Sequence, residues 1–343
     1  MPVIPATELR TLVNGIFLAA KCPENVSQLV TDSLVASNLV GHDSHGVIRV
    51  PAYMERIRSG ELDPHGAITT ARESASTALL DCGRNFGQFA ARRAMDVAIA
   101  KARQHDVGVV VTSRSGHTGR LGEYAVMAAE QGMIGLVFCS GTVPGGQVAP
   151  FGGIGRALGA NPIAWGIPGG KGRPIFMDFA TSIVAQGKIQ VAIDKGEEVP
   201  LGWILDKEGR PTTHPRDHGA GGVLLPFGGH KGYGISVMIE LITGGLSGLG
   251  TTLLRAPGAG REQGMVYMAV NISAFQPLDE FNRQVDAFVE QLKKTPCAEG
   301  VEEILLPGEP EWRCRAQREQ KGIPLPDGTW KRIQAIVPHG IQG

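Results

Sequence analysis

Apolar residues recur at helical spacing through the first part of the chain. The spacing predicts three short helices, over residues 9–17, 26–35 and 47–57. Pro23 precedes the second helix and Ser59-Gly60 follows the third, as is typical of these residue types at helix ends. We therefore expect three helices before any convincing strand.

From about residue 73 the pattern changes to short apolar runs that alternate with longer amphipathic ones. The short runs predict strands at Thr77–Leu80, Val107–Val111, Ile134–Phe138, Ile163–Ile167, Ile175–Met177 and Met265–Asn271. The longer runs predict helices at Phe86–Arg103, Leu121–Gln131, Ile183–Ile193 and Gly234–Ile242. Such alternation is typical of an α/β body around a mostly buried sheet.

Helical spacing returns from Leu278 onward. The apolar residues on one face of this predicted helix are Phe281, Val285, Phe288, Val289 and Leu292. We therefore divide the chain into a helical N-terminal segment (1–72), an α/β core (73–275) and a helical C-terminal segment (276–343). We expect the two helical segments to pack together in one layer.

Composition and charge exclude several classes of function. The 343 residues carry 33 basic and 33 acidic side chains with a pI near 7.1, so no excess of positive charge is available for nucleic acid or an anionic membrane. No apolar stretch approaches the ~18 residues of a membrane helix, and the first residues lack a secretory signal. The cysteines are scattered, at Cys22, Cys82, Cys139, Cys297 and Cys314. We expect reduced thiols and a cytoplasmic protein, with neither nucleic acid nor membrane as partner.

Glycine is unusually abundant, with 48 residues. The chain nevertheless lacks the Gly-x-Gly-x-x-Gly fingerprint of Rossmann dinucleotide sites. Its glycine-dense stretches include residues 116–122 and 228–234, and the second contains His230 and Lys231. A lysine between glycines can bind phosphate or carboxylate while the backbone comes close to the ligand. A bound nucleotide would therefore be held by amides of these loops and of helix starts.

The densest polar cluster is GHDSHGVIR at residues 41–49. If the third helix begins near Ser44, His45 and Arg49 lie one turn apart on one face. The guanidinium can then hold a carboxylate while the imidazole gives or takes a proton at the adjacent carbon, which suits a 2-oxo acid. Ser44 would reach His45 only in turn geometry. The alternative is that Asp43 or Ser44 caps the helix and the histidines lie at its solvated start.

Two further candidates follow predicted strands. Asp178, in MDFATS at 177–182, could orient His45 and favour its protonated form, but a plain cluster of helix-capping residues is the alternative. His117 lies in the glycine-rich turn after Val107–Val111. It could contact a ligand, and the alternative is an ordinary solvated histidine in a loop. The histidines and cysteines have no metal-ligand spacing, and the chain has no Gly-x-Ser-x-Gly of a serine hydrolase. We infer no metal.

Taken together, these stretches resemble the type-2 malate/L-lactate dehydrogenase family over nearly the whole chain. The most specific marks are GHDSHGVIRVPAY (41–53), ALGANPIAWGIP (157–168), MDFATS (177–182), PFGGHKGYGISVMIEL (226–241) and LPGEPEWRCRAQREQKGIPLP (306–326). Within the family, the layout is most similar to that of bacterial hydroxycarboxylate dehydrogenases. The resemblance implies an α/β fold with a non-Rossmann mixed sheet flanked by helices, and a helical layer formed by the N- and C-terminal segments.

The resemblance also implies an oxidoreductase that uses NAD or NADP and moves a hydride between C4 of nicotinamide and C2 of a small 2-hydroxy or 2-oxo carboxylic acid. The residues matching its substrate side are His45 (proton donor), Ser44 and Asp178 (supporting relay), and Arg49 and His117 (substrate contacts). Those matching its cofactor side, within the 73–275 core and beyond, are His117, Thr118, Gly119, Arg120, Leu121, Met177, Asp178, Phe179, Ala180, His230, Lys231, Leu306, Pro307, Gly308, Glu309, Pro310, Glu311 and Trp312. Members of the family commonly form homodimers.

The chain departs from the family pattern at two positions. Gly116 stands where relatives usually have Asn, and Ala160 where Thr is common. Both changes remove polar groups, so no relative's substrate is transferred to this chain. Our leading hypothesis is a dehydrogenase of 2-hydroxy acids. The alternatives are a reductase of cyclic imine 2-carboxylates and a catalytically silent nucleotide-binding or scaffold protein.

Overall fold

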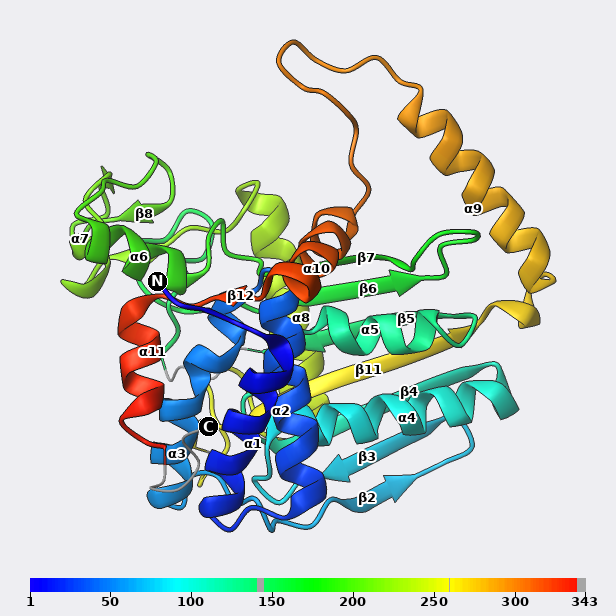
Figure 1. Cartoon of the computed structure of the whole chain (residues 1–343), viewed down its shortest axis with the longest axis horizontal. Helices are drawn as coiled ribbons and strands as arrows, with labels where there is room; N and C mark the ends of the chain where they lie inside the picture. Colours follow the sequence, from blue (N-terminus) through cyan, green and yellow to red (C-terminus); the bar gives the residue numbers. More distant parts are fainter. Residues whose placement is uncertain (141–144, 259, 338–343) are drawn as a thin grey trace.

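The chain folds around a seven-stranded mixed sheet, in a computed structural model that describes residues 1–140, 145–258 and 260–337 (Figure 1). The strand order is β2-β3-β4-β11-β5-β6-β7, and β3 and β4 are its parallel pair. The strands are β2 (Thr69–Glu73), β3 (Thr77–Asp81), β4 (Val107–Ser115), β5 (Met133–Cys139), β6 (Ile163–Ile167), β7 (Ile175–Phe179) and β11 (Gln263–Asn271). The non-Rossmann mixed sheet expected from the sequence is confirmed.

Each predicted strand is present. The differences concern where two strands end and one strand at the edge of the sheet. β4 continues to Ser115 and β7 to Phe179, which carries both strands into the predicted functional loops. The edge strand β2 was missed, since all five of its residues are exposed and it has no apolar alternation.

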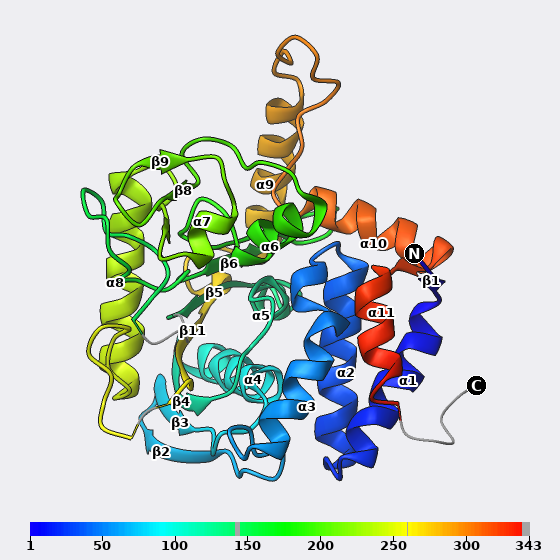
Figure 2. The same ribbon diagram turned by 90° about the vertical axis from the view of Figure 1, so that its left-hand side faces the viewer.

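Helices cover both faces of the sheet (Figure 2). α4 (Gly87–His105) and α5 (Gly122–Ala129) pack on one face, and α8 (His230–Ser247) packs on the other. α8 begins four residues before its predicted start because Gly228 and Gly229, both at positive φ, turn the chain directly into the helix. As a result, His230 and Lys231 form its first turn.

The two ends of the chain build one helical layer beside the sheet, as expected. It contains α1 (Ala6–Ala19), α2 (Glu24–Leu39), α3 (Val50–Arg58), α10 (Glu309–Lys321) and α11 (Asp327–Gln334). α10 contacts α2, and α11 contacts α3. The expectation of no strand before these helices was wrong, because β1 (Val3–Ile4) pairs with β12 (Ile323–Pro324). Such a short strand forms only with its distant partner and leaves no pattern in the sequence.

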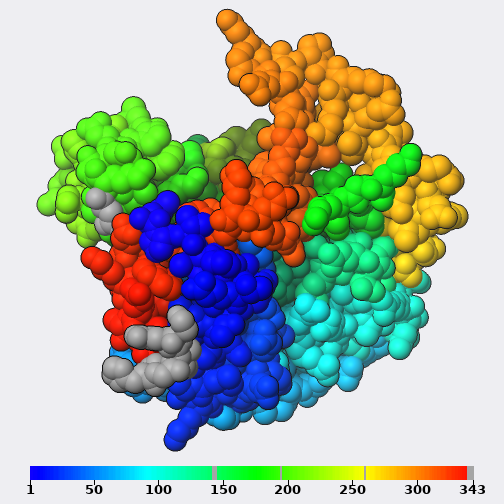
Figure 3. All heavy atoms as spheres, viewed as in Figure 1, coloured from blue at the N-terminus to red at the C-terminus, as the bar shows by residue number. Residues whose placement is uncertain are grey.

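α9 (Leu278–Lys293) does not join this layer. It lies at the opposite end of the sheet and projects from the body together with the segment that follows it (Figures 1 and 3). Of its predicted apolar face, Val285 is buried but Phe288 is 64 % exposed. Within the predicted segment 276–343, therefore, α10 and α11 pack on the N-terminal helices and α9 does not. The boundaries at 72 and 275 stay predictions.

A smaller unit follows β7. It contains α6 (Gln186–Lys195), α7 (Arg216–Gly219) and the three-stranded sheet of β8 (Ile204–Leu205), β9 (Pro211–Thr212) and β10 (Val223–Leu224). α6 begins later than predicted because the Ile183 amide donates to the Leu225 carbonyl, which keeps the preceding chain extended. Among the described residues, no helix combines the length and apolar character needed to cross a membrane.

Candidate active site

The polar cluster at residues 42–49, here called the His45 loop, forms two short turns instead of the start of one helix. Asp43–His45 and Val47–Arg49 are separate 3-10 turns, and Gly46 between them is extended (φ −88°, ψ −153°). The prediction that His45 and Arg49 lie one turn apart on a single helix was therefore wrong. Turn geometry instead brings Ser44 Oγ within 2.9 Å of His45 Nδ1, and Arg49 Nε donates to the Ser44 carbonyl at 2.6 Å.

Asn38, near the end of α2, joins the two turns of the His45 loop. Its side-chain amino group donates to Asp43 Oδ1 at 2.6 Å, and its side-chain oxygen accepts from the Val47 amide at 2.8 Å. Gly46 passes directly over this side chain, because a Cβ there would lie 2.1 Å from Asn38 Oδ1. Residue 46 must therefore be glycine for the loop to close on α2.

α10 holds the same loop from outside. Both terminal nitrogens of Arg318 donate to the Asp43 carboxylate, at 2.7 and 3.1 Å, and Glu311 Oε1 lies 3.3 Å from His42 Nε2. No side chain caps the Asp43–His45 turn, so the alternative of a capped helix start was wrong. Arg318 was missed because it is 275 residues away from Asp43 in the sequence.

His117 lies beside His45. The two imidazole rings stack with centroids 5.8 Å apart and an angle of 18° between their planes. His117 Nδ1 is 2.8 Å from the Tyr53 hydroxyl, and Gln88 Nε2 donates to the same hydroxyl at 2.8 Å. The sequence pointed to His117 but not to Tyr53 or Gln88, although Tyr53 ends the motif at 41–53.

Asp178 lies on β7 and accepts a hydrogen bond from the Gly122 amide at 2.7 Å. Burial raises the pKa of its carboxyl, against the effects of this amide and of the Arg120 charge. Within the described part of the chain, no hydrogen bond joins Asp178 to His45, whose Nδ1 contacts Ser44. The expected direct orientation of His45 by Asp178 is therefore not seen, and its supporting role stays a prediction.

Both stacked histidines are neutral at pH 7. Burial lowers the pKa of His45 to about 3, and the charges of Arg49, His42 and Arg120 contribute. Burial also lowers the pKa of His117 well below its ordinary value, with added effects of Arg49, His45 and Arg56. The expectation that the surroundings favour protonated His45 was wrong for the free protein, because burial disfavours the charged ring and the charges around it are positive.

Arg120 is a buried cation with free donors. It is 6 % exposed, and its Nε and Nη1 have no hydrogen-bond partner among the described residues. The guanidinium carbon lies 5.7 Å from the centroid of the Phe176 ring. A buried charge without hydrogen bonds is costly, so the site suits a ligand that brings acceptor atoms to this guanidinium.

The predicted cofactor-side stretches meet around β7. The Phe179 and Phe227 rings pack edge to face at 5.4 Å, which places the loop before His230 against the end of this strand. The start of α10 lies against the same strand, since the Phe176 amide donates to Pro307 and Trp312 Nε1 donates to the Pro174 carbonyl at 2.9 Å.

The turn that carries His117 is held by Gln263, another residue that the sequence did not indicate. Its side-chain oxygen accepts from the Thr118 amide at 2.9 Å and lies 3.1 Å from the Thr118 hydroxyl. At Gly116, one of the two departures from the family pattern, a Cβ would lie 2.8 Å from the Asn85 carbonyl oxygen. The backbone at 116 is therefore closely packed in this chain.

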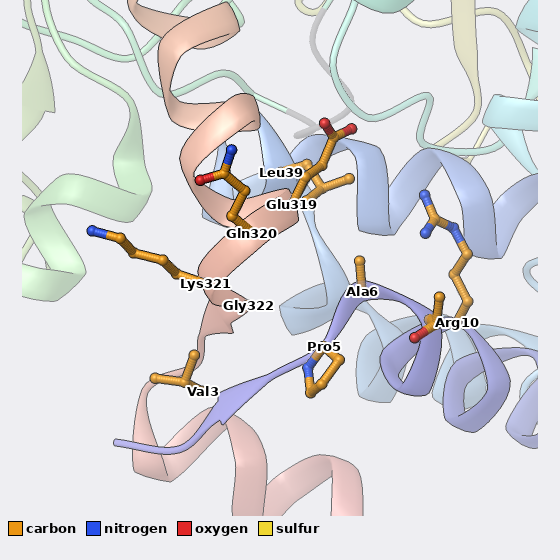
Figure 4. A pocket seen from close by; sticks show the side chains of 10 residues that line it. Val3, Pro5, Ala6, Arg10, Leu39, Glu319, Gln320, Lys321 and Gly322 are labelled. Atoms are coloured by element: carbon orange, nitrogen blue, oxygen red, sulfur yellow. The ribbon is translucent and has the colours of Figure 1, made fainter.

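The described residues form no metal cluster, and one cavity among them has a lining that is separate from this site. The described residues contain no group of three or more His, Cys, Asp or Glu side chains able to hold a metal ion. A cavity of about 340 Å³ lies between the start of α1 and the end of α10, lined by Pro5, Arg10 and Lys321 among others (Figure 4). Its lining residues include none of the predicted site residues.

The contact between α10 and the His45 loop predicts a stability difference between two arginines of one helix. Arg318→Met should lower the free energy of unfolding by about 1–2 kcal/mol, because Asp43 loses a two-pronged charged partner. Arg315→Met is the matched control, since Arg315 pairs with Glu319 at the exposed side of α10, and it should cost about 0.5 kcal/mol or less. Urea unfolding measures both. Equal losses would contradict a special role for Arg318.

The lowered pKa of His45 predicts a pH dependence of stability. Unfolded His45 takes up a proton as the pH falls below about 6.5, whereas the folded protein does so only near pH 3, so stability is lost between these values. From pH 7 to pH 5 the loss from this residue should be about 1–2 kcal/mol. The variant His45→Gln should lose less, while His117 still contributes its own part. Thermal unfolding at both pH values measures this, and an identical loss in the variant would refute it.

Comparisons with known proteins identify the family of the chain. Residues 4–334 match the family model described as malate/L-lactate dehydrogenase. The chain is 39 % identical to a malate dehydrogenase of Pyrococcus abyssi, over 99 % of this chain and 96 % of the relative. Among solved structures, a putative malate/lactate dehydrogenase from E. coli superposes with a TM-score of 0.91 at 36 % identity, covering 100 % of this chain and 96 % of that one.

A third comparison is with a reductase. The structure of a Δ1-piperideine-2-carboxylate reductase from Pseudomonas syringae pv. tomato matches with a TM-score of 0.86 at 30 % identity, over 98 % of this chain and 100 % of that one. The family model and the identities extend over nearly the whole chain, including the His45 loop, β7 and α10. The chain therefore belongs to the malate/L-lactate dehydrogenase family, and it is an enzyme of the 2-hydroxyacid dehydrogenase type.

Proposed function

We propose that the enzyme transfers a hydride between the nicotinamide of NAD or NADP and C2 of a small 2-hydroxy or 2-oxo carboxylic acid. The observation that carries this proposal is the His45 loop. It presents an imidazole whose Nδ1 is bound by Ser44 and a guanidinium whose Nη1 and Nη2 form no hydrogen bond with the described residues. A 2-oxo acid offers an adjacent carboxylate and carbonyl to this pair.

Arg49 is the proposed carboxylate clamp. Its Nε is occupied by the Ser44 carbonyl, which fixes the plane of the guanidinium and leaves the two terminal nitrogens for a carboxylate. Held in this way, the substrate has its C2 oxygen next to the acid group that Arg49 binds. The clamp thus determines which atom of the substrate meets the imidazoles.

His45 is the proposed proton donor and acceptor. Since its Nδ1 contacts Ser44, Nε2 is the nitrogen available to the substrate. In the oxidation direction the neutral imidazole accepts the hydroxyl proton, and its low pKa in the free protein keeps it ready to do so. In the reduction direction it must carry a proton. A bound carboxylate offsets the Arg49 charge, which is one cause of the lowered pKa, and so favours that proton.

The family implies a nicotinamide cofactor, which when bound supplies or accepts the hydride. The residues proposed to hold it are the loop 117–121, residues 177–180 on β7, His230 and Lys231, and residues 306–312. The unpartnered nitrogens of buried Arg120 support this assignment, since they need acceptor atoms from a ligand. Lys231 lies exposed at the start of α8 without an ion pair in the described ranges, so its charge is available to a phosphate.

A reductase of cyclic imine 2-carboxylates is the second candidate. The piperideine-2-carboxylate reductase among the structural neighbours supports it, because such a substrate needs the same clamp and the same hydride path. The two candidates differ in the atom bound to C2, which is oxygen in a 2-oxo acid and nitrogen in a cyclic imine.

We also propose that the enzyme is a cytoplasmic homodimer. The outer face of α8 is apolar and uncovered, with Met238, Leu241 and Leu246 each more than half exposed. Leu253 and Leu254, which follow α8 in the sequence, are also exposed, at 62 and 79 %. Several exposed apolar side chains on one helix suit a second copy of the chain packed about a two-fold axis. The cysteines are free thiols, as a reducing compartment requires.

The kinetic test separates the two roles in the His45 loop. His45→Ala should lower kcat by about 10² or more with little change in cofactor affinity, because only proton transfer is lost. Arg49→Met should raise KM for the carboxylate substrate and, through misorientation, lower kcat as well, and Arg49→Lys should restore part of the binding. His65→Ala, at an exposed loop position, is the control.

Steady-state absorbance of the reduced nicotinamide measures these variants across 2-oxo acids and cyclic imine carboxylates with each cofactor. Turnover of cyclic imines without turnover of any 2-oxo acid would replace the first candidate by the second. Cofactor binding without turnover of either class would indicate a silent nucleotide-binding protein. Unchanged kinetics of both variants would remove His45 and Arg49 from the mechanism.

The homodimer has its own test. Leu241→Glu should convert the protein from dimer to monomer in sedimentation velocity, because it places a charge in the middle of the proposed interface. Val191→Glu, a change of the same kind at an exposed position on α6, should leave the dimer intact. A wild-type monomer at micromolar concentration, or a Leu241→Glu dimer, would contradict the assignment of the interface to this face.

A further inference from the structure

A series of hydrogen bonds behind His117 defines which of its two ring nitrogens carries the proton. Gln88 Nε2 lies 2.8 Å from the Tyr53 hydroxyl, which in turn lies 2.8 Å from His117 Nδ1. Tyr53 is 2 % exposed and Gln88 is fully buried, so water does not compete for these groups. His117 itself is half-buried and lies at the outer end of this series of hydrogen bonds.

The direction of each hydrogen bond from Gln88 through Tyr53 to His117 follows from the donors available. A tyrosine hydroxyl has one proton, and burial raises the pKa of Tyr53, which keeps that proton in place. Because the hydroxyl oxygen accepts from the Gln88 amino group, its proton is free to go to His117 Nδ1. Nδ1 then acts as acceptor, and the neutral ring must carry its own proton on Nε2.

The orientation of the Gln88 amide is consistent with this direction. Its oxygen, Oε1, is buried without a partner among the described residues, while its amino group is bound to Tyr53. The opposite orientation would turn the amino group away from Tyr53 and into the place where Oε1 now has no partner. A buried N–H without a partner is rarer in folded proteins than a buried carbonyl without one.

We propose that Tyr53 and Gln88 are positioning residues that hold His117 as the Nε2–H tautomer, so that His117 donates a hydrogen bond to the substrate while His45 alone exchanges the proton. The two stacked imidazoles then have different tasks. His45 contacts a serine hydroxyl, which can donate or accept as the ring changes its charge. His117 Nδ1 is the acceptor for the Tyr53 proton, because Gln88 donates to the same hydroxyl, so protonating Nδ1 would leave the buried Tyr53 proton without an acceptor.

This inference rests on the proposed function only for the identity of the group that receives the hydrogen bond. The geometry makes the donor suitable for the C2 oxygen of a 2-oxo acid, on which negative charge develops during reduction. The tautomer itself is a property of the free protein, so it is measured independently of any turnover.

The experiment is nitrogen-15 NMR of the full-length protein labelled at histidine. Long-range proton–nitrogen correlation distinguishes a protonated from a bare ring nitrogen, and His117→Gln assigns the His117 signals. We expect neutral His117 with protonated Nε2 and bare Nδ1 throughout pH 6 to 9. A proton on Nδ1, or titration of His117 within this range, would overturn the proposal.

Two variants test the positioning residues. Tyr53→Phe should abolish the preference for the Nε2–H form and lower kcat/KM about tenfold. Tyr233→Phe is the control, because it removes the same atom from a partly buried tyrosine that packs against the hydrophobic cluster of Val148, Ile189 and Ile204. It should leave the His117 signals unchanged.

If Tyr53→Phe does not fold, Gln88→Met provides the second measurement. It removes the donor to the Tyr53 hydroxyl at similar side-chain size, and it should give a mixture of the two tautomers of His117. Retention of the pure Nε2–H form in both variants, or in the one that folds, would show that neither residue selects the tautomer. If the wild-type protein turns over neither 2-oxo acids nor cyclic imine carboxylates, the proposed function is refuted. The NMR result on the tautomer of His117 is unaffected by that outcome.

Discussion

The side chain of Asn38 is the contact on which the geometry of the candidate site depends. It binds Asp43 in the first turn of the His45 loop and the Val47 amide in the second, so one amide from α2 fixes both turns. Gly46 can cross above it only because it has no side chain. The separation of Ser44, His45 and Arg49 is set in this way by a residue that contacts no ligand in our proposal.

α10 connects the two sides of the site. Its first turn lies against β7 through Trp312, and its later turns bind the His45 loop through Glu311 and Arg318. The strand that carries Asp178 and the loop that carries His45 are therefore held by one helix from the end of the chain. This explains physically why the C-terminal segment returns to the N-terminal helices instead of following α9 outward.

The site has positive charge and hydrogen-bond donors that suit a bound anion. Arg49 and Arg120 have free donors, and their positive charges contribute to the low pKa of His45. A carboxylate substrate would satisfy these donors and move the pKa of His45 back toward its ordinary value. In our proposal, substrate binding and proton exchange are thereby coupled, which suits the 2-hydroxyacid dehydrogenase type to which the enzyme belongs.

The sequence by itself determined six of the seven strands of the main sheet, most helices and the motif residues, because apolar periodicity and short motifs are local properties. It indicated His45, Arg49, His117 and Asp178 as candidates for the same reason. The tertiary structure alone decided how they are arranged. The split of the His45 loop into two turns depends on Asn38 and Gly46, and the support from Gln88, Gln263 and Arg318 comes from residues far away along the chain. No periodicity records such contacts, since they exist only once α2, α4, β11 and α10 have packed together.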